Sequence, residues 1–261
     1  MSQSPFGEML REWRGRRKLS QLDLALASEV SSRHLSFVET GRATPSAPLV
    51  DRFAHELTMP LRAHNALRIA AGYAPVHSER PLDDPALAEA RAAVQRVLTA
   101  HEPFPALAVD RVWNLVAANA ALPMLLAGVD EDLLAPTLNV LRVALHPRGL
   151  AARIANFSEW RAHLLARLEV QIAASGDAAL MALDQELRRL PFPDTAPPPR
   201  VSGTAIAVPL LLDSPVGRLS FISTTTVFGT PLDVTLSELA IEAFFPADRE
   251  TGERLRALAA G

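Results

Sequence analysis

The chain has 261 residues, 49% of them hydrophobic, and a formal net charge of −3 at pH 7. This length suggests one large domain or two ordinary ones, and the apolar content excludes the intrinsically disordered classes. The absence of cysteine excludes disulfides, zinc–thiolate sites and thiol catalysis, and it fits a reducing compartment.

The first 72 residues are predicted to form five short helices. Phe6, Leu10 and Trp13 recur at helical spacing, and Ser20 and Ser31 are favourable N-caps for the second and third helices. The fourth and fifth helices are expected in the segments PSAPLVDRFAHEL and MPLRAHNALRIAAG. This part carries ten Arg or Lys and seven Asp or Glu, whereas residues 73–261 carry 16 and 22. A basic end on an acidic body is compatible with nucleic-acid binding.

Residues 73–85, YAPVHSERPLDDP, contain three prolines and a charge cluster and are predicted to be a linker. The rest of the chain, residues 86–261, is expected to form a second domain. The expected order is a helix at 86–101, a β-hairpin at 105–119, helices across 120–190, a proline-rich loop at 191–199, strands in TAIAVPLLL and GRLSFISTTTVF, a segment at 235–245 that is ambiguous between helix and strand, and a final helix at 248–260. The sequence therefore predicts an α+β protein.

The segment SQLDLALASEVSSRHLSFVETG, residues 20–41, has the spacing of a DNA-reading helix-turn-helix. Such a unit needs a small residue where two helices cross, here Ala25, then a tight turn and a second helix with a free outer face. The alternative is a plain helical hairpin in a bundle, whose solvated face would more often be rich in Glu and Lys. The predicted DNA-binding residues are Gln21, Ser31, Ser32, Arg33, Ser36, Phe37 and Arg42.

The N-terminal residues of a recognition helix point into the major groove, so Ser32 and Arg33 are expected to contact base edges. Gln21 and Arg42 are expected to contact the DNA backbone. One such unit reads only a few base pairs, so we expect a homodimer on a two-fold symmetric operator, with the two units about 34 Å apart.

Residues 6–60 resemble the Xre or phage-repressor type of helix-turn-helix domain. The residues that carry the resemblance are Gln21, Ala25, Leu35, Glu39 and Gly41. Glu29 departs from the pattern because it stands at the turn position usually held by glycine, where a left-handed backbone would cost a non-glycine residue about 1 kcal/mol. The resemblance also implies an ion pair between Arg14 of the first helix and Glu39 near the end of the recognition helix.

The segments RHLSFVETGRATPS, LRIAAGYAP, NVLRVALHPRGL and FGTPLDVTLSELAIEAFFPAD together resemble the MmyB-like transcription regulators. This resemblance implies an N-terminal five-helix domain of the lambda-repressor type and a C-terminal PAS-like domain, in which helices cover a curved antiparallel sheet. A related member is associated with a bound long-chain fatty acid. The resemblance thus implies a sensor of an apolar small molecule, with a fatty acid as a possible effector.

Polar residues within apolar segments are the candidates for the polar end of a ligand cavity. Asn139, Arg142 and His146 are spaced by three and four residues, which would place them on one helical face. A buried arginine requires an anion, which is either a protein carboxylate or the carboxylate of a ligand. We expect an elongated apolar cavity between the sheet and the helices of residues 120–190. The candidates for its wall are Trp113, Leu138, Ile154, Phe157, Trp160, Phe221 and Phe228.

Common catalytic signatures are absent from the sequence, including GxGxxG, GxSxG, HExxH and GxxxxGK[ST], and the seven histidines lack close metal-ligand spacing. We therefore expect no enzyme activity, no catalytic cofactor and no metal. The N-terminus lacks an apolar core of signal-peptide length, and the apolar run Leu115 to Val129 is interrupted by Asn119 and Pro123. This predicts a cytoplasmic protein without a membrane partner.

Two functions remain open on the sequence alone. The first is a sequence-specific DNA-binding transcription regulator that senses an apolar small molecule, with the linker at 73–85 transmitting the change to the DNA-reading units. In the second, the C-terminal domain serves only as a dimerisation or protein-interaction module.

Overall fold

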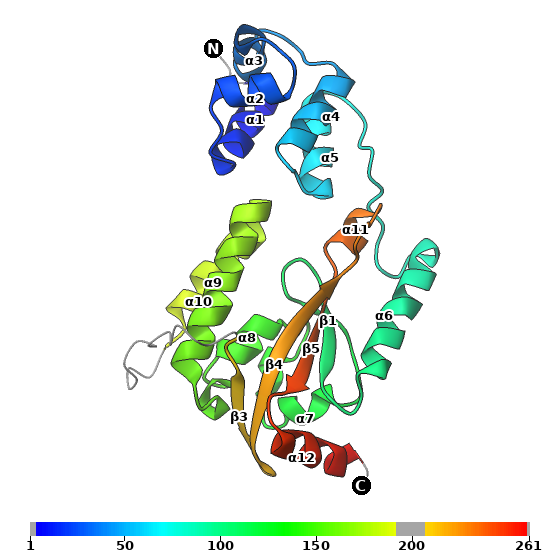
Figure 1. The fold of residues 1–261 in the computed structure, drawn as a ribbon, viewed down its shortest axis with the longest axis vertical. Helices are drawn as coiled ribbons and strands as arrows, with labels where there is room; N and C mark the ends of the chain where they lie inside the picture. Colours follow the sequence, from blue (N-terminus) through cyan, green and yellow to red (C-terminus); the bar gives the residue numbers. More distant parts are fainter. Residues whose placement is uncertain (1–3, 192–206, 260–261) are drawn as a thin grey trace. The chain divides into compact units, whose positions relative to one another are not determined.

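The computed structural model describes residues 4–191 and 207–259. Contacts within the chain divide it into two compact units, built mainly from residues 1–80 and from residues 81–261 (Figure 1). No helix in the described part of the chain is long and apolar enough to cross a membrane.

The N-terminal unit contains the five predicted helices. They are α1 (Pro5–Arg16), α2 (Gln21–Ala27), α3 (Ser32–Glu39), α4 (Ala47–Glu56) and α5 (Leu61–Ala70). Local capping explains two of the helix starts. The Ser20 hydroxyl accepts a hydrogen bond from the Asp23 N–H and the Asp23 carboxylate accepts one from the Ser20 N–H, while the Ser31 hydroxyl accepts from the His34 N–H. The buried faces of the helices share one core that includes Leu10, Leu24, Leu35 and Phe53.

The turn between α2 and α3 keeps the left-handed conformation although it lacks glycine. Glu29 has a φ of 55°, and the next residue, Val30, donates its N–H to the Ala25 carbonyl over 2.9 Å. Arg52 of α4 donates to the Glu29 carboxylate at 2.9 Å and to the Ser28 carbonyl at 3.0 Å. The left-handed conformation costs a non-glycine residue about 1 kcal/mol, and the hydrogen bonds from Arg52 help to hold Glu29 in it.

The segment after α5 is fastened to that helix. Asn65 donates its side-chain amide to the His77 carbonyl over 2.8 Å and accepts the His77 N–H over 3.0 Å. The ring nitrogens of His77 and His64 lie 3.0 Å apart, and His64 also bonds Asp51. Burial, and secondly the charge of His64, lowers the pKa of His77. The first residues of the predicted linker are therefore held against the N-terminal unit.

The C-terminal unit is built on a five-stranded antiparallel sheet. Its strands are β1 (Ala106–Val109), β2 (Leu115–Ala118), β3 (Leu210–Ser214), β4 (Gly217–Val227) and β5 (Ala240–Pro246), in the order β2-β1-β5-β4-β3 (Figure 1). The strands β1 and β2 form the hairpin that the sequence predicts at 105–119. The α+β class and the antiparallel sheet with covering helices are confirmed.

Helices cover both faces of this sheet. The helices of this unit are α6 (Ala88–Ala100), α7 (Leu122–Leu126), α8 (Val140–Leu145), α9 (Phe157–Ser175), α10 (Ala178–Arg189) and α12 (Arg249–Ala259), with 3-10 turns η1 (Pro85–Leu87), η2 (Glu131–Leu133) and η3 (Ala151–Arg153). The short helix α11 (Val234–Ser237) lies in the connection between β4 and β5. Alternation along β1 sorts its side chains: Leu107 and Val109 belong to the core shared with α7 to α10, whereas Ala106 and Ala108 belong to the core shared with α6.

Two sequence expectations are refined. The ambiguous segment 235–245 divides into the end of the short helix α11 and most of strand β5. The strand expected in TAIAVPLLL starts at Leu210, and the first three residues of that segment lie outside the described residues, as does the proline-rich loop at 191–199 except for Pro191.

Candidate functional site

The outer face of α3 carries a compact basic and aromatic surface. The Arg33 guanidinium carbon lies 5.3 Å from the centroid of the Phe37 ring, and that of Arg42 lies 5.9 Å from the same ring. Both arginines are exposed, and Ser32 and Ser36 are partly exposed beside them. Two cations close to one aromatic ring form a positively charged surface, in which cation–π contacts hold the long arginine side chains.

Glu39 ties this surface to the rest of the unit. Its side chain is fully buried, and Arg14 donates Nε and Nη2 to its two carboxylate oxygens over 2.8 and 3.2 Å. Gln21 donates its side-chain amide to the same carboxylate over 2.7 Å. The carboxylate thus joins α1, α2 and α3. Gln21, which the sequence assigns to the DNA backbone, uses one of its two amide hydrogens inside the protein.

Sequence reasoning missed a close helix approach at Gly7. A Cβ atom built on Gly7 would lie 2.1 Å from the Glu39 carbonyl oxygen, a distance no side chain tolerates. Glycine at this position therefore lets α1 approach the end of α3 closely enough for Arg14 to reach Glu39. A glycine inside a predicted helix, seven residues before the arginine, was the available signal.

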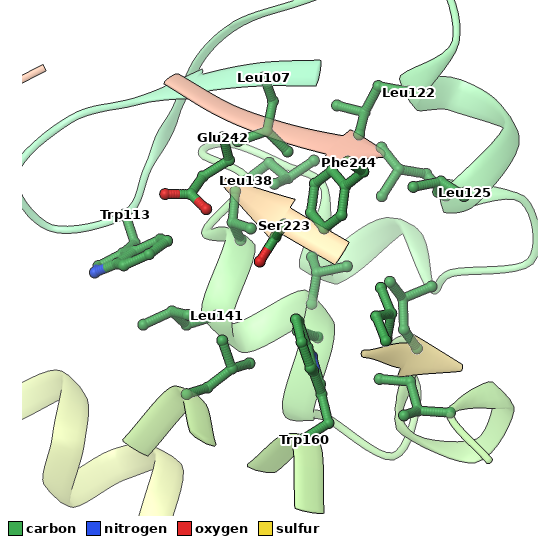
Figure 2. Close-up of a pocket in the computed structure, with 18 of the residues that line it drawn as sticks. Leu107, Trp113, Leu122, Leu125, Leu138, Leu141, Trp160, Ser223, Glu242 and Phe244 are labelled. Carbon is green, nitrogen blue, oxygen red and sulfur yellow. The ribbon is translucent and has the colours of Figure 1, made fainter. Parts of the chain in front are cut away.

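A second candidate site is an apolar cavity in the C-terminal unit, with a volume of about 70 Å³ (Figure 2). It lies between the sheet and the helices α7, α8 and α9, within the region 120–190 where the sequence places it. Four of the predicted wall residues line it: Trp113, Leu138, Ile154 and Trp160. Other lining side chains come from the sheet and α7, including Leu107, Leu122, Leu125 and Phe244 (Figure 2).

The other predicted wall residues lie elsewhere. Phe221 on β4 is fully buried in the core and packs edge-on against Phe244, with ring centroids 6.1 Å apart. Phe157, at the first turn of α9, packs at the margin of that core. Phe228 follows the end of β4 and packs with the cluster under α6. Large apolar residues were sound candidates for burial, but the sequence alone could not tell which of them line the cavity, which pack elsewhere in the same core and which, like Phe228, belong to the cluster under α6.

The residues predicted for the polar end lie outside the lining of the cavity. Asn139 is the N-cap of the six-residue helix α8 and His146 is its C-cap, and neither residue lines the cavity. Arg142 donates Nε and Nη2 to Glu186 of α10 over 2.6 and 2.8 Å, and about two fifths of its side chain is exposed. The hydrogen bonds to Glu186 raise the pKa of Arg142. Its anion is therefore a protein carboxylate, outside the cavity.

The polar groups that do line the cavity are Arg167, Glu242 and Ser223. Figure 2 shows the Glu242 carboxylate reaching toward Trp113 and away from Leu125. Arg167 and Glu242 form a double ion pair, one arm of which spans 3.0 Å between Nη1 and Oε2. Two signals could have found this pair. Arg167 recurs seven residues after Trp160 on α9, and Glu242 interrupts the apolar strand AIEAFF.

Trp113 is held at this end of the cavity by several contacts. Its backbone is left-handed, with a φ of 69°, and its indole N–H donates to Gln171 over 2.8 Å. The Arg167 guanidinium carbon lies 4.7 Å from the centroid of its ring. A non-glycine residue in this conformation costs about 1 kcal/mol, and such strain tends to gather at ligand sites. Among the described residues, no group of three or more His, Asp or Glu is placed to hold a metal ion.

Comparison with known families agrees with the two units. Residues 90–258, well over half of the chain, match the model for the MmyB-like transcription regulator ligand binding domain. The chain belongs to the MmyB-like transcription regulator family. Residues 5–67 match a helix-turn-helix domain model. The expectation that the chain is no enzyme agrees with its place in a family of transcription regulators.

Individual relatives resemble parts of this MmyB-like regulator. It is 41% identical over 71 residues to the uncharacterized HTH-type transcriptional regulator RghRB of Bacillus subtilis (strain 168), a match that covers 27% of the chain and about half (49%) of that relative. The crystal structure of the clp gene regulator ClgR from Corynebacterium glutamicum is similar over 26% of the chain and 86% of its own length, at 30% identity and a TM-score of 0.24.

The structure of an RNA-binding light-oxygen-voltage receptor is similar over 99% of this chain and 64% of its own length, at 14% sequence identity and a TM-score of 0.29. TM-scores this low do not establish a shared fold. The architecture of the MmyB-like regulator rests on its own helices and strand pairing.

Proposed function

We propose that this MmyB-like regulator binds a two-fold symmetric DNA operator as a homodimer and responds to an apolar small molecule bound in its C-terminal unit. The family resemblance implies a long-chain fatty acid as one such molecule. The observation that carries the DNA half is the exposed surface of α3, and the one that carries the sensor half is the apolar cavity.

The surface of α3 suits recognition of double-stranded DNA. Ser32 and Arg33 stand in its first turn, the part of a recognition helix that enters the major groove. Arg33 can bond two acceptors on a guanine, and Arg42, just beyond the helix, can pair with a phosphate. Ser31, Ser36 and Phe37 complete the contact surface, and Glu39 holds the whole helix in place through Arg14.

Selection of binding sites from random double-stranded DNA tests this half. We expect enrichment of a two-fold symmetric sequence whose half-sites lie one helical turn apart. Sedimentation of the protein should give a dimer on that DNA. A monomer that binds a single half-site at full affinity would contradict the proposed homodimer.

The cavity suits an apolar ligand because its lining is almost entirely hydrocarbon. Each buried CH₂ group contributes about 0.8 kcal/mol, so a chain can bind with few polar contacts. An engineered cavity of about 150 Å³ takes up benzene. The present volume of about 70 Å³ is smaller, so a long acyl chain requires the lining side chains to move apart, whereas a short chain requires less movement.

The competing function is a C-terminal unit that only joins protein chains. Denaturing mass spectrometry of an organic extract from the purified protein separates the two. A stoichiometric apolar molecule in the extract would support the sensor. An empty extract, together with no binding of any alkyl compound added in solution, would leave the interaction module.

A further inference from the structure

The polar end of the cavity carries no net charge. Of the described residues that line the cavity, Arg167 and Glu242 are the only charged ones, and they face each other in a double ion pair. The Glu242 side chain is 4% exposed, and that of Arg167 is 22% exposed. His163, one turn earlier on α9, has its pKa lowered by burial and secondly by Arg167, which favours its neutral form.

The ion pair is also satisfied within the protein. Both oxygens of Glu242 accept from Arg167, and Thr225 donates its hydroxyl to one of them over 2.9 Å. Arg167 donates in addition to the Thr225 hydroxyl over 2.5 Å and stacks on Trp113. Arg167 therefore already has the bidentate carboxylate partner that an anionic ligand would have to provide.

An anionic head group would be disfavoured at this end. To pair with Arg167 it would displace Glu242 and leave a buried carboxylate without its cation, which is the costly outcome when a buried pair is broken. If it did not displace Glu242, two like charges would share one low-dielectric space. A neutral polar group meets neither penalty, because a hydroxyl can donate to Glu242 and accept from Ser223 or Arg167.

We infer that the ligand of this cavity is a neutral molecule: a short hydrocarbon body with one hydroxyl or carbonyl group that docks beside Arg167, Glu242 and Ser223. The inference rests on the proposed sensing function, but it assigns this cavity a neutral ligand in place of the fatty acid anion that the family resemblance implies. The hydrocarbon body would lie among the leucines of α7 and α8, and the polar group would lie near Trp113 (Figure 2).

Isothermal titration of the full-length protein at pH 7.5 with 1-octanol and with octanoate tests the inference, because the two probes differ only in the charge and shape of the head group. We expect the wild type to bind 1-octanol at least tenfold more tightly than octanoate. Glu242→Gln removes the internal anion, so it should raise the affinity for octanoate at least tenfold and remove the preference.

Glu186→Gln is the matched control, since it frees Arg142 in the same way outside the cavity. It should leave both affinities unchanged, and its circular dichroism spectrum and that of Glu242→Gln should match the wild type. If Glu242→Gln does not fold, the preference of the wild type for 1-octanol over octanoate tests the inference by itself. Tighter binding of octanoate by the wild type would overturn the inference and leave the sensor standing. Binding of neither probe would overturn both.

Discussion

The substitution Glu39→Gln tests how the DNA-reading helix is held. Three N–H groups, two from Arg14 and one from Gln21, converge on the buried carboxylate. A glutamine offers one acceptor oxygen and turns its own N–H groups toward these donors, so the charge of Arg14 loses its partner. Breaking a buried ion pair in this way costs 3–5 kcal/mol. Because the Arg14 side chain keeps 15% of its exposure, we expect the low end, about 3 kcal/mol.

Hydrogen–deuterium exchange of the full-length protein, read on peptides from α1 and α3, measures this loss within the unit concerned. A loss of about 3 kcal/mol corresponds to exchange on the order of 100-fold faster. Glu12→Gln on α1 is the control, because Glu12 is exposed and pairs with Arg16 across one helical turn, an interaction whose loss changes exchange about twofold. An increase in the exchange rate below about fivefold for Glu39→Gln would refute the role of Glu39 in holding α1 and α3 together.

Three further predictions concern the N-terminal unit. Gly7→Ala should destabilise it by about 1–3 kcal/mol in urea unfolding through the clash with α3, whereas Gly15→Ala on the same helix, which meets open space, should not destabilise it. In DNA-binding titrations Arg33→Ala should lose about 1–3 kcal/mol of binding free energy on the preferred operator and relax the sequence preference of the protein. Arg42→Ala should weaken binding to all sequences alike and lower the salt dependence of the binding constant by about 1 in its log–log slope. An unchanged sequence preference in Arg33→Ala would overturn the assigned reading face. The fold lowers the pKa of His77, so the stability that neutral His77 contributes is present above its unfolded pKa of about 6.5 and is lost as the pH falls below that value. The melting temperature should therefore fall between pH 7.5 and pH 5.5, and it should fall less in His77→Gln. An equal fall in the variant would contradict this prediction.

The N-terminal helices were predictable because their determinants are local. Ser20 and Ser31 cap the helices that the sequence assigns to them, and the spacing of Leu35 and Val38 marks the buried face of α3. The Arg14–Glu39 contact followed from family resemblance, and the structure brings the two side chains together. The approach at Gly7 was not predictable in this way, because it depends on how two helices meet in space.

The cavity shows where sequence reasoning ends. The expected layers predicted where the cavity lies, and the predicted wall residues Trp113 and Trp160 line it. The spacing around Arg142 pointed to a polar end at α8, whereas the structure pairs Arg142 with Glu186 and places other polar residues in the cavity lining. The charged pair that lines the cavity joins α9 to β5 across 75 residues. Arg167 and Glu242 each stand out locally in the sequence, but no local pattern shows that the two side chains meet.

Operator affinity with and without a cavity ligand tests the central claim most directly. The claim is that occupancy of the apolar cavity changes DNA binding. Fluorescence anisotropy on the selected operator should show a change of at least fivefold, in either direction, when 1-octanol saturates the wild type. The variant Ala144→Leu fills part of the cavity from α8 and should lose that response while still binding the operator. Wild-type protein that binds 1-octanol with unchanged operator affinity would contradict the account.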